Sequence, residues 1–166
     1  MWVTAMTAPS AARIADHKHV IASFLTGFDG TRKVFDAYRA RYAELGRPAP
    51  ADDRFAYAAL VYTGRTDEEG IAGAEKLMWY VKANKVPFRS AYDFNNMTLT
   101  DMIDNGIVFA GSADTVREQV EKFYSHVGGF GHLLLTGQAG FLEHDRTVRG
   151  IETFASEVKP KLAAHA

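Results

Sequence analysis

The chain contains no cysteine, which excludes disulfides, thiolate metal sites and cysteine nucleophiles together. This absence fits a reducing compartment. No apolar run is long enough to span a bilayer, and the N-terminus lacks a basic segment followed by an apolar stretch, so we expect a cytoplasmic protein that does not associate with membranes. The charges nearly cancel, with 19 Lys and Arg against 20 Asp and Glu, and no basic footprint is there to attract nucleic acid.

The remaining composition is typical of a folded globular protein. The 166 residues are 47% hydrophobic and 23% charged, without low-complexity segments. Because a chain of this size can bury a sizeable core, we predict a single compact domain over residues 1–166.

Short apolar runs alternate with segments of helical period along the chain. Four runs are almost continuously apolar, as parallel strands covered on both faces tend to be: 2–6, 19–25, 54–62 and 131–136. The alternation predicts an α/β fold with a parallel sheet, either an open doubly wound sheet or part of a (β/α)8 barrel. The GGFG at 128–131 precedes a strand, whereas a dinucleotide fingerprint follows one, so no Rossmann signal is present.

Three helices show apolar stripes that we predict to face the core. The stripes are Val34, Tyr38, Tyr42 and Leu45; Val116, Val120, Phe123 and Val127; and Val148, Ile151, Phe154 and Val158. Residues typical of helix ends also occur in the sequence. Thr66 with Glu69 matches a capping box, Gly46 ends the second helix, and Ser112 stands where a cap is expected.

The stretch from 82 to 105 breaks this rhythm, and we predict a long connection there, with a short helix near Leu99 to Ile103. Connections of this length include functional lids as well as surface insertions without a function. A short extended piece is expected at 107–111.

The C-terminal part of the sequence resembles a known family. GIVFAGSADTVREQVEKFYSHVGGFGHLLLTGQAG (106–140), followed by a helix ending in FASEVKPKL, is similar to the C-terminal signature of bacterial-luciferase-like flavin-dependent monooxygenases. Upstream, WVTAMTAPSAARIAD (2–16) resembles the family's fifth strand and the helix after it, and YDFN (92–95), within the connection 82–105, resembles the segment near the family's mobile active-site loop. The resemblance therefore implies the C-terminal half of a (β/α)8 TIM-type barrel, with about four βα units and an incomplete barrel in this chain.

One helix start is suited to an anion such as a phosphate. A helix N-terminus offers free N–H groups and a partial positive charge, unless an acid already occupies its first turn. The helices after Thr66 and Ser112 carry such acids. The helix that opens with TAPSAAR (7–13) has no acid before Asp16 and carries two hydroxyls and an arginine.

The resemblance points to the same helix start. In the family, the loop after the fifth strand holds the phosphate of flavin mononucleotide (FMN). By position this implies the hydroxyls of Thr7 and Ser10 with backbone N–H groups around Met6 and Ala8. The alternative from the residues alone is that Thr7 only caps the helix and Ser10 is a solvated first-turn residue.

The resemblance also implies the chemistry. The expected activity is that of a flavin-dependent monooxygenase or oxidoreductase, which uses reduced FMN and dioxygen to oxygenate a small organic substrate; a deazaflavin coenzyme is the alternative cofactor. No catalytic residue is assigned in this half. His17 and His19 lack a third ligand, so no metal is expected.

A function of another class stays open. The chain would then be a non-catalytic flavin-binding or assembly half-barrel, which forms a homodimer or complements a missing N-terminal half, because a half-barrel leaves strand edges and an apolar face unpaired.

Overall fold

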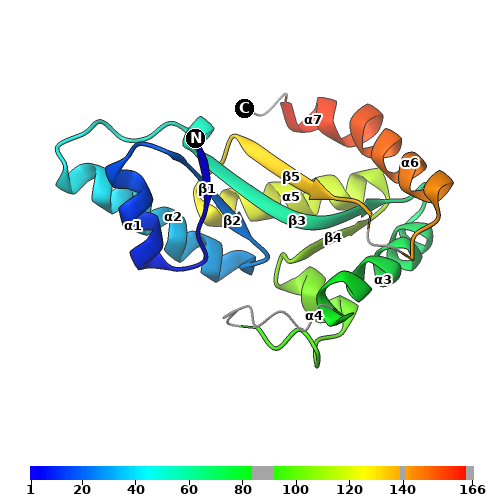
Figure 1. Ribbon diagram of the computed structural model, residues 1–166. Coiled ribbons are helices and arrows are strands. Elements are labelled where there is room, and N and C mark those ends of the chain that lie inside the picture. The colour runs from blue at the N-terminus through cyan, green and yellow to red at the C-terminus, as the bar shows by residue number, and fades with distance from the viewer. Residues whose placement is uncertain (84–91, 139–140, 164–166) are drawn as a thin grey trace. The chain divides into compact units, whose positions relative to one another are not determined.

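The protein has an α/β fold, as the sequence predicts. The computed structural model describes residues 1–83, 92–138 and 141–163 (Figure 1). The elements in chain order are β1 (Trp2–Thr4), α1 (Ala8–Asp16), β2 (Val20–Phe24), α2 (Gly27–Glu44), a 3-10 turn (Asp52–Arg54), β3 (Phe55–Thr63), α3 (Asp67–Ala83), α4 (Leu99–Asp104), β4 (Val108–Gly111), α5 (Ala113–Val127), β5 (His132–Thr136), α6 (His144–Thr153), a π-helical segment (Phe154–Val158) and α7 (Lys159–Ala163).

Each of the five segments expected to be extended contains one of these strands. The strands form one five-stranded sheet, and the three pairings with a defined register are parallel. None of the helices in the described ranges has both the length and the apolar character needed to cross a bilayer.

The chain divides into two compact units. Unit 1 consists of Met1–Ala59 and Phe123–Leu134, and unit 2 of Leu60–Lys122 and Leu135–Ala166. The division passes through β3, α5 and β5, so each of these elements contributes residues to both units. A single domain over 1–166 stays a prediction.

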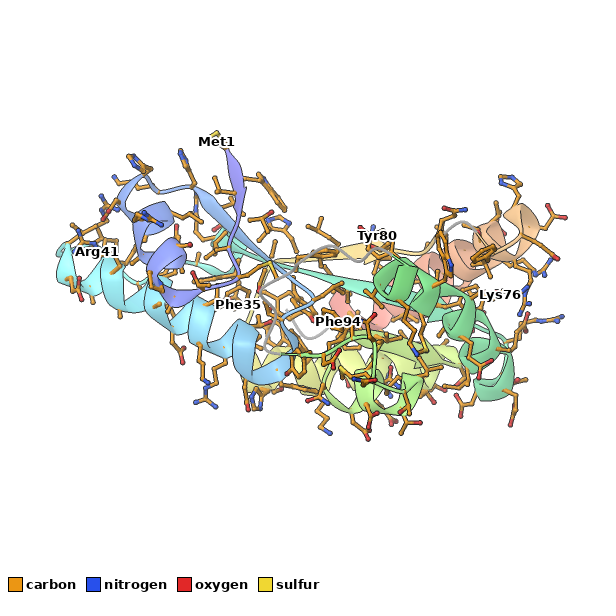
Figure 2. All side chains as sticks on the ribbon, turned by 60° about the horizontal axis from the view of Figure 1, so that its bottom comes forward. Met1, Phe35, Arg41, Lys76, Tyr80 and Phe94 are labelled. Atoms are coloured by element: carbon orange, nitrogen blue, oxygen red, sulfur yellow. The ribbon has the colours of Figure 1, made fainter. Side chains whose placement is uncertain are left out.

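Aromatic side chains fill the core of unit 1. Phe55 of β3 packs against Phe35 and Tyr38 of α2, whose ring centroids lie 4.8 and 5.3 Å away. Figure 2 labels Phe35 on α2. Tyr57 stacks on Phe123 of α5, with 4.1 Å between the centroids. The alternation of β3 thus presents Phe55 and Tyr57 to the helices, as a strand with period two must.

Arg39 of α2 binds the turn at Gly128 and Gly129, which connects α5 with β5. Its guanidinium donates hydrogen bonds to the carbonyls of Val127, Gly128 and Gly129 at 3.1, 2.6 and 3.2 Å. The same group lies 4.5 Å from the centroid of the Phe55 ring. Gly128 and Gly129 have φ values of 78° and 93°, which glycine adopts without strain, so the turn can bring α5 back to β5.

Unit 2 depends on a very close approach of α3 to β4. The second half of β3 pairs in parallel with β4, with Leu60 opposite Val108 and Thr63 opposite Gly111. A Cβ atom on Gly70 of α3 would overlap with the backbone of Gly111. Glycine at position 70 is therefore a packing requirement.

Two of the three predicted apolar stripes contain residues that the structure places outside the core, and Val148 of the third stripe is only half-buried. The stripe of α5 is buried throughout, as predicted. Leu45 is 38% exposed because α2 ends at Glu44 and Leu45 lies beyond its last turn. Ile151 is 51% exposed because α6 turns Thr147 and Gly150 toward the interior instead.

The predicted helix ends are largely confirmed. Gly46, with a φ of 64°, follows the end of α2. Thr66 accepts a hydrogen bond from the Glu69 N–H at 3.3 Å, but the Glu69 carboxylate binds the N–H and guanidinium of Arg65, so the capping box is only half formed. Within the connection predicted at 82–105, α3 continues to Ala83 and the short helix expected near Leu99 is α4; residues 84–91 lie outside the described residues.

The Asp67 carboxylate is expected to make the stability of the protein depend on acid pH. It accepts a 2.7 Å hydrogen bond from the Ser112 N–H, which lowers the pKa of Asp67 in the folded chain. A lowered folded pKa gives a contribution to stability that is complete above the ordinary pKa of about 4 and is lost as the pH falls through the folded pKa.

We therefore expect Asp67→Asn to reduce the loss of stability between pH 5 and pH 2, measured by urea unfolding. Asp104→Asn is the matched control, because this exposed carboxylate makes no hydrogen bond or ion pair with the described residues. Equal pH profiles for wild type and Asp67→Asn would contradict the assignment.

Candidate functional site

The candidate site lies in unit 1, where β1 passes into α1. The Ala5 N–H still bonds to the Ala22 carbonyl at 2.9 Å, so the chain stays beside β2 to that point. Thr7 is the N-cap in an extended conformation, and Pro9 stands in the first turn, where a missing N–H costs nothing. Met6 is half-buried between the strand and the helix, and Ala8 is the first residue of α1.

Thr7 and Ser10 lie side by side at this helix start. The Thr7 hydroxyl donates a hydrogen bond to the Ser10 hydroxyl at 3.0 Å and makes no capping bond to the backbone. Thr7 therefore does not act as a side-chain cap. The first N–H groups of the helix have no intrahelical partner, and of these Pro9 supplies none.

The electrostatics of this helix start favour an anion. The first turn of α1 contains no acid, and Arg13 follows one turn later. Arg13 makes no ion pair with any residue that the structure describes. The nearest acid along the helix, Asp16, is paired with Arg41 at 2.7 Å, so its charge is compensated at the other end of α1.

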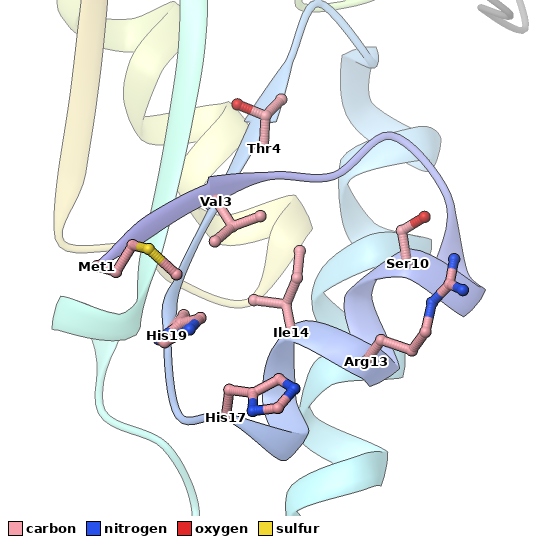
Figure 3. Close-up of a pocket in the computed structure, with 8 residues that line it drawn as sticks. All are labelled: Met1, Val3, Thr4, Ser10, Arg13, Ile14, His17 and His19. Carbon is pink, nitrogen blue, oxygen red and sulfur yellow. The ribbon is translucent and has the colours of Figure 1, made fainter.

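An open groove of about 510 Å³ runs beside this helix start (Figure 3). It is lined by Met1, Val3, Thr4, Ser10, Arg13, Ile14, His17 and His19. Ser10 and Arg13 stand at one end of the groove, Val3 and Ile14 lie along its middle, and Met1 and the two histidines stand at the other end. The groove therefore combines a polar, basic end with an apolar middle.

His17 and His19 stack on each other with 5.6 Å between their ring centroids. In the ranges that the structure describes, no three His, Cys, Asp or Glu side chains come together in a way that would hold a metal ion. The pair therefore contributes two polar rings to the groove.

The groove itself was not predicted from the sequence, although a signal for it exists. Ser10, Arg13, Ile14 and His17 have the spacing i, i+3, i+4 and i+7, which places them on one face of α1. This pattern is not an apolar stripe, because three of its four residues are polar or charged.

Comparison with known proteins extends this description. The family model described as luciferase-like monooxygenase matches residues 1–129. No curated protein matches the chain significantly.

Several solved structures share the fold. The oxygenating constituent of 3,6-diketocamphane monooxygenase from Pseudomonas putida, solved with FMN, is 20% identical with a TM-score of 0.71, over 97% of this chain and 48% of its own. Monooxygenase RslO1 from Streptomyces bottropensis is 17% identical with a TM-score of 0.74, over 96% and 47%. The coenzyme F420 dependent tetrahydromethanopterin reductase from Methanopyrus kandleri is 14% identical with a TM-score of 0.70, over 97% and 50%.

The chain therefore spans about half the length of each of these proteins. Its parallel α/β fold matches theirs over nearly all of its own residues, which confirms the prediction of part of a (β/α)8 barrel.

Proposed function

Because the chain belongs to the luciferase-like monooxygenase family, we propose that it is the C-terminal half of a flavin-dependent monooxygenase that acts on a small organic substrate with reduced FMN and dioxygen. The observation that carries this proposal is the start of α1. This helix start has no acid in its first turn, two adjacent hydroxyls, and an arginine without an ion pair in the described residues.

The flavin phosphate is proposed to bind at this helix start. The hydroxyls of Thr7 and Ser10 would each donate to a phosphate oxygen, and backbone N–H groups around Met6 and Ala8 would add further donors. For this, Thr7 must give up its bond to Ser10, which costs little because the pair is exposed. Arg13, one turn on, adds a positive charge on the same side of the helix.

These donors fit a phosphate and leave the identity of the ring system open. The same contacts would suit a deazaflavin coenzyme that carries a phosphate, and the similar structures include one solved with FMN and one described as dependent on coenzyme F420. Flavin binding is the direct test: we expect the chain to quench FMN fluorescence saturably and to bind riboflavin more weakly.

The bound flavin would supply the redox and oxygen chemistry, whereas this chain would hold the phosphate and keep water from one side of the cofactor. No side chain of this half is assigned to proton transfer.

Turnover by the chain alone is expected to be absent or very weak. The chain spans 48% of the similar 3,6-diketocamphane enzyme, so a large share of an enclosed cofactor site would have to come from elsewhere. The measurement is substrate-dependent oxygen consumption with reduced FMN. Addition of an N-terminal half from a relative should raise the rate, and rapid oxygenation by the chain alone would overturn the prediction.

A second candidate function is assembly without catalysis, as a homodimer or with a complementing half. It is favoured by the edge position of β1, which pairs only with β2 among the described strands and carries Trp2 at 48% exposure. Light scattering tests the homodimer: a stable monomer at all concentrations would exclude it and leave only assembly with a complementing half.

A further inference from the structure

Unit 2 contains a small cavity at the carboxyl end of β3, which we call the β3-end cavity. It has a volume of about 150 Å³, and its lining includes Thr63, Arg65, Glu69 and Arg149. None of its lining residues belongs to the groove beside α1. The volume admits a group of a few heavy atoms and excludes a flavin ring system.

Thr63 is the first sign that this cavity takes a ligand. It is the last residue of β3 and is only 2% exposed. Its hydroxyl is buried and finds no hydrogen-bond partner among the described residues. A buried hydroxyl without a partner destabilises a fold, so its presence in the wall of a cavity points to a partner that enters from outside the chain.

The charged residues around Thr63 are not all neutralised. Arg65 binds the Glu69 carboxylate at 2.9 Å, and this ion pair lowers the pKa of Glu69. Arg149 is exposed and makes no hydrogen bond or ion pair through its guanidinium with any part of the chain that the structure describes, although its charge also helps to lower the pKa of Glu69. The cavity thus holds one ion pair and one guanidinium that no carboxylate of the described residues binds directly.

The other hydroxyls of the lining are already used as donors. Thr153 and Ser156 donate to the carbonyls of Arg149 and Glu152, each at 2.8 Å. Glu152 is exposed at the rim, where water screens its charge. The side-chain donors left for a ligand are therefore the Thr63 hydroxyl, the Arg149 guanidinium and, at the exposed rim, the Nη groups of Arg65.

We propose that the β3-end cavity binds a small oxyanion, a phosphate or a carboxylate group, between the Thr63 hydroxyl and the Arg149 guanidinium. A guanidinium offers two parallel N–H donors that match two oxygens of such a group, and the hydroxyl takes a third lone pair. The oxyanion is either a free ion or the anionic end of a larger molecule. This inference does not depend on the proposed flavin function.

The test is a titration with orthophosphate, and in parallel with acetate, by calorimetry at constant ionic strength. It is made in the Ser10→Glu background, in which the helix start of α1 is closed to anions. We expect saturable binding of at least one of the two ions and at least a tenfold loss of affinity in Arg149→Gln. Arg146→Gln is the charge-matched control, because Arg146 is on the same helix and does not line the cavity.

Thr63→Val separates a ligand site from a packing defect. Without added ion this variant should raise Tm by about 2–4 °C, because it removes an unpartnered buried hydroxyl and keeps the side-chain shape. It should also lower the affinity at least threefold, since one donor is lost.

Thr147→Val is the matched control for Thr63→Val. Thr147 is 7% exposed, and its hydroxyl also lacks a partner among the described residues, but it lines a cavity of only about 10 Å³. It should gain stability without any change in affinity. The proposal is overturned if neither ion binds saturably, if Arg149→Gln binds as tightly as Arg146→Gln, or if the two threonine variants have the same affinity.

Discussion

Replacement of Ser10 by glutamate is expected to weaken FMN binding about a hundredfold while leaving the chain at least as stable as before. The glutamate would place a negative charge in the first turn of α1, beside the proposed phosphate position. Two unit charges about 6 Å apart repel by about 3 kcal/mol at an effective dielectric constant of about 20. The same charge stabilises the helix dipole by about 0.3–1 kcal/mol, so stability and affinity should move in opposite directions.

The measurement is FMN fluorescence quenching together with urea unfolding. Ser125→Glu, at an exposed position in the last turn of α5, is the control for added charge: it should leave FMN affinity unchanged and slightly lower stability, because a negative charge there opposes the helix dipole. The double variant Thr7→Ala/Ser10→Ala should lose about tenfold, because two donors to a charged group are removed while the backbone donors remain.

Riboflavin lacks the phosphate and supplies the decisive comparison. Both variants should bind riboflavin nearly as the wild type does. If FMN and riboflavin weaken equally, or if neither weakens, the phosphate is not held at the start of α1.

Gly70→Ala is expected to cost about 3 kcal/mol of unfolding free energy. In an exposed helix this substitution normally stabilises by about 1 kcal/mol, because alanine is the better helix former. In α3 the new methyl group would overlap with the backbone of Gly111, which cannot move aside as a flexible side chain would. The sign of the effect therefore reports on the contact between α3 and β4.

Urea unfolding gives the measurement, with a lower midpoint and an unchanged m-value. Gly137→Ala is the control, since the nearest atoms to its added Cβ are 3.6 Å away, an ordinary contact distance. A Gly70→Ala variant as stable as the wild type would show that α3 does not pack this closely against Gly111.

The strands were predictable because their sequences are nearly continuously apolar, and even the short β4 stands out, because the apolar run 107–110 lies between Gly106 and Gly111. Helix faces were less predictable. Ile151 has the right spacing for a core residue, but Tyr62 of β3 occupies the space in front of Gly150 and turns α6 so that Ile151 faces outward. Spacing defines a face of a helix, whereas the shape of the neighbouring strand decides which face is buried.

The helix start of α1 and the β3-end cavity also differ in how far the sequence predicts them. Thr7, Ser10 and Arg13 are close in sequence, so the absence of acids between them could be read directly from the residues. Thr63 and Arg149 meet through tertiary packing, and no local pattern marks a buried hydroxyl as unpartnered. The sequence therefore predicts the first of the two proposed sites and gives no sign of the second.

The division of β3 and α5 between the two units also sets the order in which the chain can fold during translation. Residues 1–59 leave the ribosome long before Phe123–Leu134, the segment that completes unit 1. At 5–20 residues per second the intervening stretch takes roughly 3–13 s to synthesise. Throughout that interval Tyr57 has no Phe123 ring to stack on, so the nascent sheet presents an uncovered aromatic face to chaperones.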